Sequence, residues 1–309
     1  MPGTVTVAFV KQYSNTLFHL AQQKGSRLKA VVRNETQQGD SAFYDRLGKA
    51  TAQLKTSRHG DTPLLEAAHT RRMVTLSDYE WATLLDKQDK IRMMIDPTSA
   101  YMVAASNGLG RSIDDVIIAA ALGNAYGGNN GGTTVAQTAG QFIGAVDGGA
   151  LSRLNVDTLR KIKKIFWVNE ADGEPLHIVV DGEQLEGMLG QTEVTNSDYN
   201  TVKALAQGEI DTFMGFKFHH SERLSASGTF TINTTTGAVT LSTGNGDASR
   251  QCFAWAESGI LLATGLELDG RIDERNDKSY ATQVYARLSC GATRMEEEKV
   301  VGVLCKATA

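Results

Sequence analysis

Histidine and cysteine are the residues of this chain with the most versatile chemistry, because they bind metals and act as bases or nucleophiles. His219 and His220 are adjacent, so on a strand their side chains point to opposite faces and cannot hold one metal ion together. Cys252, Cys290 and Cys305 form neither a CxxC pair nor an even set, which is typical of small buried thiols in a reducing compartment. We expect no metal, no cofactor and no disulfide. A site that the fold assembles from a cysteine and a histidine remains an alternative.

Two other motifs could carry chemistry, but each has a structural explanation. Asp114 and Asp115 could form an acid and base pair, yet they lie where carboxylates stabilise the dipole of a helix terminus. The run GGNNGG at 127–132 has the composition of a phosphate loop, but it follows a helix instead of a strand and lacks a GK[ST] ending. We interpret it as a linker. The chain also has no GxSxG nucleophile elbow.

A basic cluster could contact nucleic acid. It lies on a predicted helix and consists of Arg160, Lys161, Lys163 and Lys164. No aromatic residues are interleaved for stacking, which favours an ordinary solvated helix face.

The element that must organise these residues is a helix predicted from Pro97 to Leu122. Its start has a typical aspartate and proline pair, and apolar residues recur near the helical period. One continuous helix would contain about 26 residues and be about 39 Å long. Gly108 and Gly110 interrupt it, each at a cost of about 1 kcal/mol against alanine. Two helices, the second capped by Ser112, are therefore the alternative.

Composition bounds the fold. With 309 residues, the chain exceeds the size at which one core usually keeps growing, so we expect two cores. It is 41% hydrophobic and 21% charged. No run approaches the length of a membrane helix, about 18 apolar residues, and the first residues lack the pattern of a signal peptide. These features predict a soluble protein with no membrane partner.

Charge is distributed unevenly. Residues 1–75 carry 11 lysines and arginines against 5 aspartates and glutamates, a balance of +6, whereas the remainder carries 20 against 30, a balance of −10. A basic extension on an acidic body can bind nucleic acid or the acidic body of another copy. Because the total charge of −4 is moderate, binding to another copy is favoured at least as much as binding to nucleic acid.

The stretch 34–63 is too polar for a core and too long for an ordinary connection. We expect an extended two-stranded excursion whose backbone hydrogen bonds are completed outside its own domain. A strand at 71–76 and a helix from Asp78 should follow. The basic residues expected to contact other subunits are Lys49, Lys55, Arg58, Arg71 and Arg72.

The remaining sequence has α/β character and then becomes rich in strands. A flexible, glycine-rich passage at 141–154 should mark a domain boundary. The predicted helices are 156–169, 183–189 with Asp181 as its cap, and 197–206. The predicted strands are 176–180, 213–220, 253–258, 259–268, 280–295 and 299–305, with a hairpin that sets Phe230 and Ile232 opposite Val239 and Leu241. The last strands should pack on the long helix.

Several segments together resemble the major capsid proteins of tailed bacteriophages, which have the Hong Kong 97 fold. The segment IDPTSAYMVAASNGLGRSIDDVIIAAALG at 95–123 is similar to their spine helix, and GEIDTFMGFKFHHSERL at 208–224 is similar to their central strand. CFAWAESGILLATG at 252–265 and YATQVYARLSCGATRMEEEKVVGVLC at 280–305 are similar to their C-terminal strands. The resemblance spans nearly the whole chain.

The resemblance implies an α+β fold with four parts. These are an N-terminal arm at 1–26, an extended E-loop at 27–72, a peripheral domain at 75–149 and 266–309 that holds the spine helix, and an α/β axial domain at 150–265. The hairpin at 228–242 would be a local elaboration of the axial domain.

The resemblance also implies a structural role without enzymatic activity. Copies of the chain would assemble, in the cytoplasm of a host bacterium, into the pentamers and hexamers of an icosahedral shell that encloses double-stranded DNA in the virion. The implied partners are other copies, a portal, packaged DNA bound without sequence specificity, and a decoration protein. Because the chain starts almost directly in the arm, a separate scaffolding protein is expected. Lys49 or Lys55 could take part in covalent cross-linking, but no motif indicates it.

Two alternatives stay open beside this one. An encapsulin-like compartment would share the fold and enclose enzyme cargo. An enzyme would need a cysteine and histidine site in the α/β domain.

Gly108 and Gly110 are then hinge candidates. A spine helix that bends as a shell expands needs a compliant point, and glycines add no side-chain packing across the bend. The alternative is that another backbone packs closely there, which also requires a missing Cβ.

Overall fold

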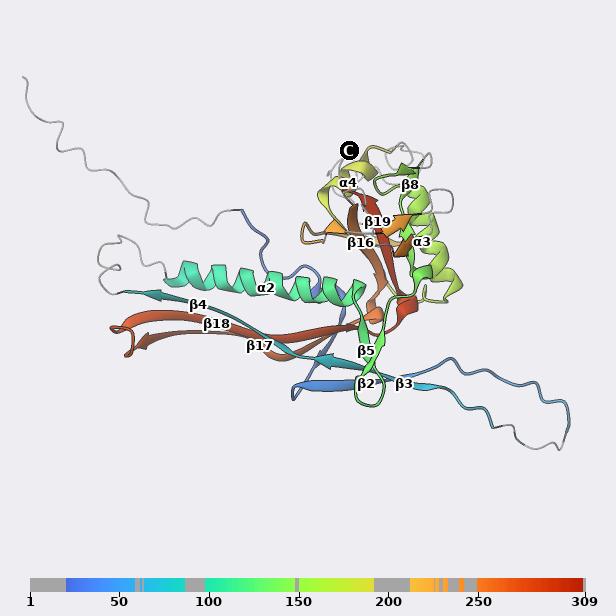
Figure 1. Ribbon diagram of the computed structural model, residues 1–309, viewed down its shortest axis with the longest axis horizontal. Helices are drawn as coiled ribbons and strands as arrows, with labels where there is room; N and C mark the ends of the chain where they lie inside the picture. Colours follow the sequence, from blue (N-terminus) through green and yellow to red (C-terminus); the bar gives the residue numbers. More distant parts are fainter. Residues whose placement is uncertain are drawn as a thin grey trace, which may run out of the picture. The chain divides into compact units, whose positions relative to one another are not determined.

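The computed structural model describes residues 21–58, 62, 64–86, 98–147, 150–191, 212–224, 226–227, 230–232, 239–241 and 249–307. The protein has a mixed α+β fold, as predicted (Figure 1). The chain forms two compact units. The smaller unit consists of Met1–Ser26, Asp78–Ser112 and Leu266–Ser289, and the larger unit consists of Arg27–Ser77, Ile113–Gly265 and Cys290–Ala309.

A seven-stranded sheet lies at the centre of the larger unit. Six strands follow the order β11-β12-β10-β16-β19-β7, and β13 pairs with β16. The β10–β12 and β19–β7 pairs are parallel, and the other pairs are antiparallel. Every residue of β10 is buried, as expected for a strand covered on both faces. The bounds are β7 Phe142–Gly144, β10 Leu176–Val180, β11 Thr212–Phe213, β12 Phe216–His220, β13 Ala226–Ser227, β16 Ser249–Ala256 and β19 Val300–Lys306.

Two helices of the larger unit confirm the predicted pattern. In α3, Val156–Val168, the side chains of Leu159, Ile162 and Phe166 are buried, and Asn155 caps the helix by accepting from the Thr158 amide. In α4, Gly182–Leu189, the Asp181 side chain caps the helix as predicted, because its Oδ1 accepts a hydrogen bond of 3.0 Å from the Gln184 amide.

The predicted excursion is present as an antiparallel ladder. Strand β2, Ser41–Leu47, pairs with β3, His69–Thr75, in a register that runs from Ser41 opposite Thr75 to Leu47 opposite His69. We call these two strands the paired part of the excursion and residues 49–67, of which 49–58, 62 and 64–67 are described, its open part. The side chains of the open part are exposed, apart from half-buried Ala67.

A second hairpin extends this ladder. Strand β5, Ala125–Gly127, pairs with β3 and with β6, Thr133–Val135, so the sheet order is β2-β3-β5-β6. The run GGNNGG therefore turns a hairpin, and its interpretation as a linker is wrong. Gly128 and Gly131 adopt left-handed backbone conformations at φ of 82° and 72°, which glycine tolerates without steric cost.

Three long elements contribute residues to both units: helix α2, Thr98–Leu122, and strands β17, Ile260–Arg275, and β18, Ala281–Arg294. Helix α2 is continuous, which confirms the prediction of one helix over that of two. Within the smaller unit, Tyr101 of α2 lies 6.4 Å from Trp81 between ring centroids. The four-stranded sheet has the order β1-β17-β18-β4, where β1 is Arg33–Thr36 and β4 is Ser77–Leu85.

The helix predicted from Asp78 is wrong, because this segment forms strand β4. Burial alternates along it: Tyr79, Trp81 and Thr83 are half-buried and the residues between them are exposed. Burial along this segment therefore follows the two-residue period of a strand. The helical spacing of Trp81, Leu84 and Leu85 was coincidental.

The passage at 141–154 also differs from its prediction. It holds the short 3₁₀ helix η3, Ala139–Gln141, the sheet strand β7 with buried Phe142 and Ile143, and the small hairpin of β8, Val146–Asp147, and β9, Ala150–Leu151. The last strand, β19, was expected to pack on the long helix, and its Leu304 does cluster with Leu122 at the end of α2. The strand itself lies in the central sheet of the larger unit, because its buried run VVGVLC pairs on both sides.

Two further predictions concern the middle of the chain. Strands β14, Phe230–Ile232, and β15, Val239–Leu241, confirm the predicted hairpin register. The helix predicted at 197–206 lies outside the described residues. The remaining short elements are the 3₁₀ helices η2 Lys29–Val31, η5 Glu257–Gly259 and η6 Glu297–Lys299.

Candidate assembly site

The paired part of the excursion is fixed by three arginines around one carboxylate, which we call the arginine cluster. Arg72 of β3 forms an ion pair with Glu297 Oε1. Arg46 of β2 lies 3.6 Å from Glu297 Oε2 and also donates to the Met295 carbonyl. Arg294 at the end of β18 approaches Glu297 to 3.9 Å. Glu297 itself lies in the turn η6.

Arg294 links this cluster to other elements of the larger unit. Its Nη1 donates to the carbonyls of Ala121 at 3.1 Å and Gly123 at 2.7 Å, at the end of α2, and its Nη2 donates to Val135 of β6 at 3.2 Å. The carbonyls of Ala121 and Gly123 would otherwise lack partners at the helix terminus. Burial lowers the pKa of Arg294 to about 10 and also lowers the pKa of Arg72. Both side chains are nevertheless cationic at neutral pH.

A cavity of about 740 Å³ opens beside the cluster. Its lining residues come from the β2–β3 ladder, from the neighbouring β5–β6 hairpin of the same sheet and from Glu297. Its charged lining residues are Asp45, Arg46, Arg71, Arg72 and Glu297, with His69 beside them.

The five predicted contact residues have different surroundings. Arg71 is exposed, lies 3.1 Å from Asp45 and stacks over the Phe43 ring at 5.8 Å. Lys49 is exposed and lies 3.6 Å from Glu170. Arg72 is only 3% exposed and pairs with Glu297 inside its own subunit, and its role as an intersubunit contact stays a prediction. Lys55 and Arg58 are exposed in the open part.

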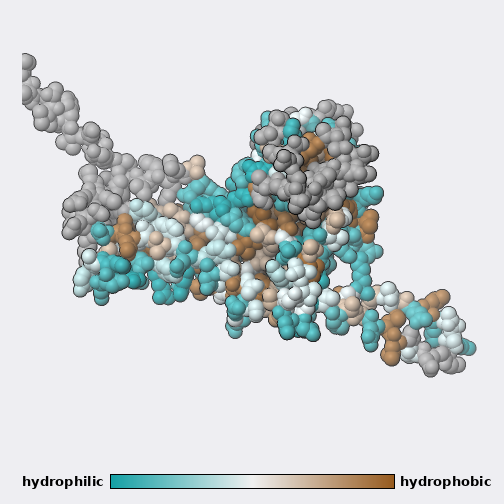
Figure 2. All heavy atoms as spheres, in the orientation of Figure 1, coloured by the Kyte–Doolittle hydropathy of each residue, from teal (hydrophilic) through white to brown (hydrophobic). Residues whose placement is uncertain are grey.

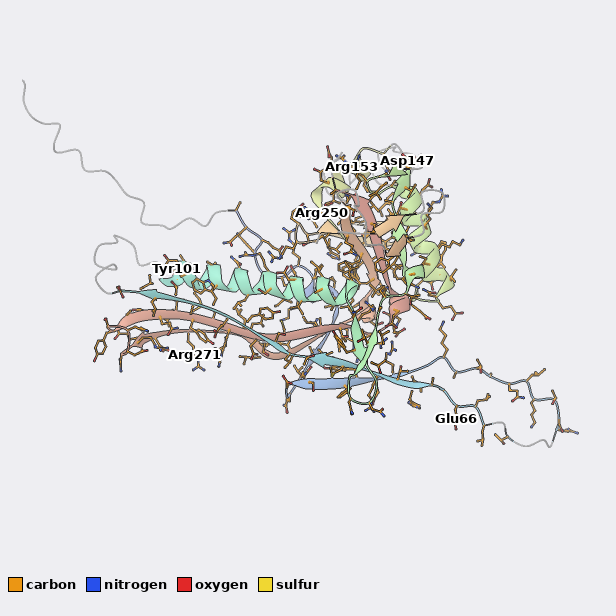
Figure 3. The ribbon with its side chains drawn as sticks, viewed as in Figure 1. Glu66, Tyr101, Asp147, Arg153, Arg250 and Arg271 are labelled. Carbon is orange, nitrogen blue, oxygen red and sulfur yellow. The ribbon has the colours of Figure 1, made fainter. Side chains whose placement is uncertain are left out.

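The open part also exposes large apolar side chains. Leu54 is 83% exposed and Leu64 is 94% exposed, and Leu65 lies beside the latter. Figure 2 shows hydrophobic residues at the far end of the excursion, and Figure 3 shows Glu66 there among side chains that extend outwards. Leucines so exposed are costly in water unless something covers them.

The two glycines of α2 are not equivalent. A Cβ at Gly110 would lie 2.6 Å from the Cα of Gly25 and 2.9 Å from the amide nitrogen of Ser26, whereas a Cβ at Gly108 would meet only Arg111 Nη2 at 3.7 Å. At Gly110 the geometry supports close backbone packing, the alternative to a hinge. Gly108 remains a hinge candidate.

The segment that packs on Gly110 is also held by side chains of the same helix. Asn107 Oδ1 accepts from the Gly25 amide at 3.2 Å. Arg111 Nη1 donates to Gln22 Oε1 at 2.9 Å and to the Gln23 carbonyl at 3.2 Å. All these residues belong to the smaller unit.

Within the larger unit, Asp114 holds the next residues of the chain. It is fully buried, and its carboxylate accepts from the amides of Arg27, at 3.1 and 3.2 Å, and Leu28, at 3.1 Å. Neighbouring Asp115 pairs with Arg223. Asp114 therefore lies within the continuous helix and does not stabilise a helix start. The missed signal was a carboxylate in line with buried Ile117 and Ala121, since a buried charge needs a partner.

The groups with catalytic chemistry have structural partners instead. His177 Nδ1 lies 3.0 Å from His219 Nε2, and His177 stacks on Trp255 at 5.5 Å. His220 contacts Arg27 at 2.9 Å and Glu222 at 2.8 Å. The adjacent histidines thus have separate partners, as the alternation of a strand predicts.

The cysteines are buried thiols. Burial raises the pKa of Cys290 to about 11, and the hydrogen bond to Cys252 together with burial raises the pKa of Cys305 well above its usual value. Neither Cys290 nor Cys305 is therefore poised as a thiolate nucleophile at neutral pH.

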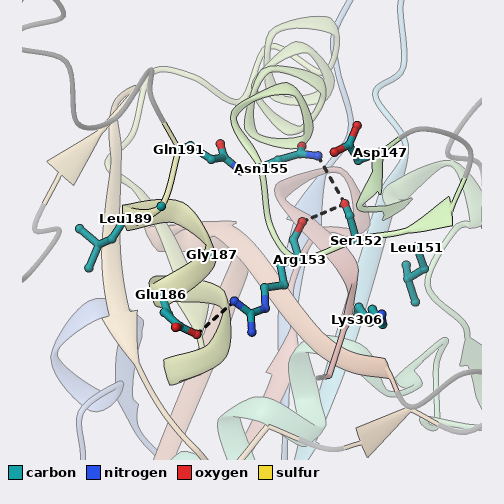
Figure 4. A pocket seen from close by; sticks show the side chains of 11 residues that line it. Asp147, Leu151, Ser152, Arg153, Asn155, Glu186, Gly187, Leu189, Gln191 and Lys306 are labelled. Carbon is teal, nitrogen blue, oxygen red and sulfur yellow. Dashed lines mark hydrogen bonds and ion pairs between the residues drawn. The ribbon is translucent and has the colours of Figure 1, made fainter. Parts of the chain in front are cut away.

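A cavity of about 800 Å³ lies between α4 and the β8–β9 hairpin (Figure 4). Its Ser152 hydroxyl donates to the Arg153 carbonyl at 3.0 Å and accepts from Asn155 at 3.4 Å, while Arg153 pairs with Glu186 at 3.1 Å. The described residues that line it include no histidine or cysteine. This serine lacks an activating base there.

Two other features are absent from the described part of the chain. No three histidine, cysteine, aspartate or glutamate side chains there lie close enough together to hold a metal ion. No described helix has the length and apolar character needed to cross a membrane.

Solved structures of phage capsids share this fold. The capsid of cyanophage Pam1 matches with a TM-score of 0.72 at 14% identity, covering 100% of this chain and 99% of that one. The capsid of Ralstonia phage GP4 matches with a TM-score of 0.71 at 12% identity, covering 100% and 98%. The capsid of cyanophage P-SCSP1u matches with a TM-score of 0.69 at 15% identity, covering 100% and 96%. The predicted tailed-phage capsid fold is thereby confirmed.

A comparison with curated proteins finds no match. The family model described as phage capsid protein matches residues 5–307. Since this match spans nearly the whole sequence, the chain belongs to the phage capsid protein family.

Proposed function

We propose that this protein is the major subunit of an icosahedral phage head shell, built from pentamers and hexamers around packaged double-stranded DNA. In this account the excursion of each subunit lies over a neighbouring copy. The supporting observation is the open part of the excursion, which exposes Leu54, Leu64 and Leu65.

A suitable surface for the excursion exists in the smaller unit. Strand β17 exposes apolar side chains on one face and charged side chains of both signs on the other. The exposed apolar residues are Leu266, Leu268 and Ile272, and the charged residues of the other face are Glu267, Asp269, Arg271, Asp273 and Arg275. The excursion combines exposed leucines with Lys49, Lys55 and Arg58. Burial of the exposed leucines of the excursion against this apolar face favours a contact between the two surfaces on different copies.

The domain assignment remains a proposal. The arm would be 1–26, the E-loop 27–72, the peripheral domain 75–149 with 266–309, and the axial domain 150–265. The compact units share the boundary at Leu266, but residues 290–309 lie with the larger unit. The sheet strand β19 accounts for this difference.

We further propose a portal, a separate scaffolding protein, a decoration protein and non-specifically bound DNA as partners of the shell, with assembly in the host cytoplasm. We assign no catalytic step to the protein. Its histidines and cysteines are used in internal contacts, and the family to which it belongs is structural.

The excursion is tested by replacing Leu54, Leu64 and Leu65 together with serine. Electron microscopy and sedimentation should show closed shells for the wild type and folded, unassembled subunits for the serine variant. Replacement of the same leucines with methionine keeps apolar volume and should preserve shells. Normal shells from the serine variant would refute this role of the excursion. Shells that enclose protein cargo without DNA would favour the encapsulin-like alternative.

A further inference from the structure

We propose that the cavity beside the arginine cluster binds a carboxylate, and that in the shell this carboxylate belongs to a second copy of the chain. The second half of this proposal rests on the proposed function. The first half concerns the isolated subunit and is independent of assembly.

The charges around the cavity do not balance within the subunit. Arg71 and Asp45 neutralise each other at its rim. Arg46, Arg72 and Arg294 then share Glu297 as their acidic partner among the described residues, which leaves two positive charges in excess. Two of these arginines are almost fully buried, and uncompensated buried charge is strongly unfavourable.

Hydrogen bonding in the cluster is also incomplete. The Nε atoms of Arg72 and Arg294 are buried and have no acceptor among the described residues. Of these two arginines, Arg72 lines the cavity, so an anion bound there can approach its guanidinium group. A buried donor without an acceptor is rare in folded proteins, and an ion site is one explanation. Arginine favours planar, bidentate anions, above all carboxylates and phosphates.

The cavity gives such an anion access to the cluster. Its volume of about 740 Å³ accommodates a side chain from outside, and Arg46, Arg71 and Arg72 all line it. The chain beyond residue 75 carries a balance of −10, so a neighbouring copy offers many carboxylates. Charge complementarity therefore favours another copy as the occupant.

The test on the unassembled subunit uses succinate as the probe. Thermal unfolding is followed with increasing succinate, against chloride at matched ionic strength. The melting temperature should rise with succinate and saturate, because a ligand that binds only the folded state stabilises it. Arg71→Gln removes a guanidinium group from the lining and leaves Asp45 unpaired at the rim, so it should weaken the apparent affinity about tenfold or more. Arg33→Gln, which removes an equally exposed arginine paired with Glu35, should leave it unchanged.

A variant with the opposite sign sharpens the test. Glu297→Gln removes the internal counter-charge, so this subunit should melt at a lower temperature but respond more strongly to succinate. A response that is equal in Arg71→Gln and wild type, or no saturable response in the wild type, would overturn the carboxylate site.

The second half is tested on shells. Assembled wild type should show no additional succinate response, because a neighbouring carboxylate occupies the cavity, and Arg71→Gln should assemble with lower yield than Arg33→Gln. Shells that keep the full succinate response would overturn occupation by a second copy while leaving the anion site intact. A wild type that forms no shells would refute the proposed function and leave the subunit test decisive for the site.

Discussion

The paired and open parts of the excursion are continuous in sequence but differ in how they are held. In the paired part, Arg46 and Arg72 reach Glu297 and connect the strands to the end of α2 through Arg294. In the open part, Leu54 and Leu64 face solvent. The first region is built into the subunit, whereas the second contributes little to it.

This difference indicates a division of roles. Buried ion pairs fix geometry, because displacement of either partner leaves an unpaired charge. An exposed leucine gains nothing from folding and gains burial only when another molecule covers it. The paired part therefore sets the direction of the excursion, and the open part supplies contact energy to a neighbour.

The largest expected effect is at Arg294. Arg294→Met should lower the free energy of unfolding of the unassembled subunit by about 3 to 5 kcal/mol, because it leaves the carbonyls of Ala121, Gly123 and Val135 without this donor. Denaturant titration measures this. Arg71→Gln is the matched control and should change stability by less than about 1 kcal/mol, since its ion pair is exposed. Equal effects would show that the cluster is not a structural clamp.

A fall in pH should lower the free energy of unfolding of the larger unit through His177 in its central sheet, without an effect on the open part of the excursion. Burial, together with the charges of His219 and Lys217, lowers the pKa of His177 to about 4. The unfolded side chain takes up a proton near pH 6.5, so His177 opposes folding progressively as the pH falls from about 6.5 to about 4, by about 3 kcal/mol in total. Above about pH 6.5 the side chain is neutral in both states and no longer lowers the free energy of unfolding. His177→Gln should flatten the pH dependence measured by denaturant titration, and an unchanged slope would assign it to other groups.

The glycines of α2 provide a comparison inside one helix. Gly110→Ala should destabilise the subunit by about 1 to 3 kcal/mol, because its Cβ would meet the backbone of Gly25. Gly108→Ala should stabilise it by up to about 1 kcal/mol, since the position is open. Thermal unfolding of both variants checks the signs. If Gly108 is a hinge, its alanine variant should also form precursor shells that expand slowly, and expansion at the wild-type rate would contradict that role.

The smallest effect on the subunit itself should come from the open part. Leu64→Ser should change the free energy of unfolding by less than about 0.5 kcal/mol, because the side chain is 94% exposed. Denaturant titration against the wild type measures the difference. A loss of more than about 1 kcal/mol would show that the leucine packs within its own subunit.

Sequence periodicity predicted the elements whose burial is regular. Helix α3, its buried Leu159, Ile162 and Phe166, and the cap of α4 all follow from local spacing and capping chemistry. Strand β4 was mispredicted because Trp81, Leu84 and Leu85 fit a helical face, while pairing with distant strands imposed a period of two. Pairing across long sequence separations is invisible to local patterns.

The assembly site was only partly predictable for the same reason. The polar composition of 34–63 and its basic residues indicated an excursion that needs a partner. Arg71 and Arg72 are adjacent residues of the same type, so the sequence does not show which of them is buried. Only the ion pair with the distant Glu297 identifies Arg72 as the buried one. Likewise, Asp114 looked like a helix-terminal carboxylate until the amides of Arg27 and Leu28 were found beside it.

Hydrogen exchange of the excursion tests the central claim most directly, when the same chain is compared as unassembled subunits and as shells. The account predicts that amides at 50–58 and 64–66 exchange rapidly in the subunit and become strongly protected in the shell, while those of β10 are protected in both. Protection of the open part already present in the subunit, or rapid exchange that persists in the shell, would contradict the claim that a neighbouring copy covers it.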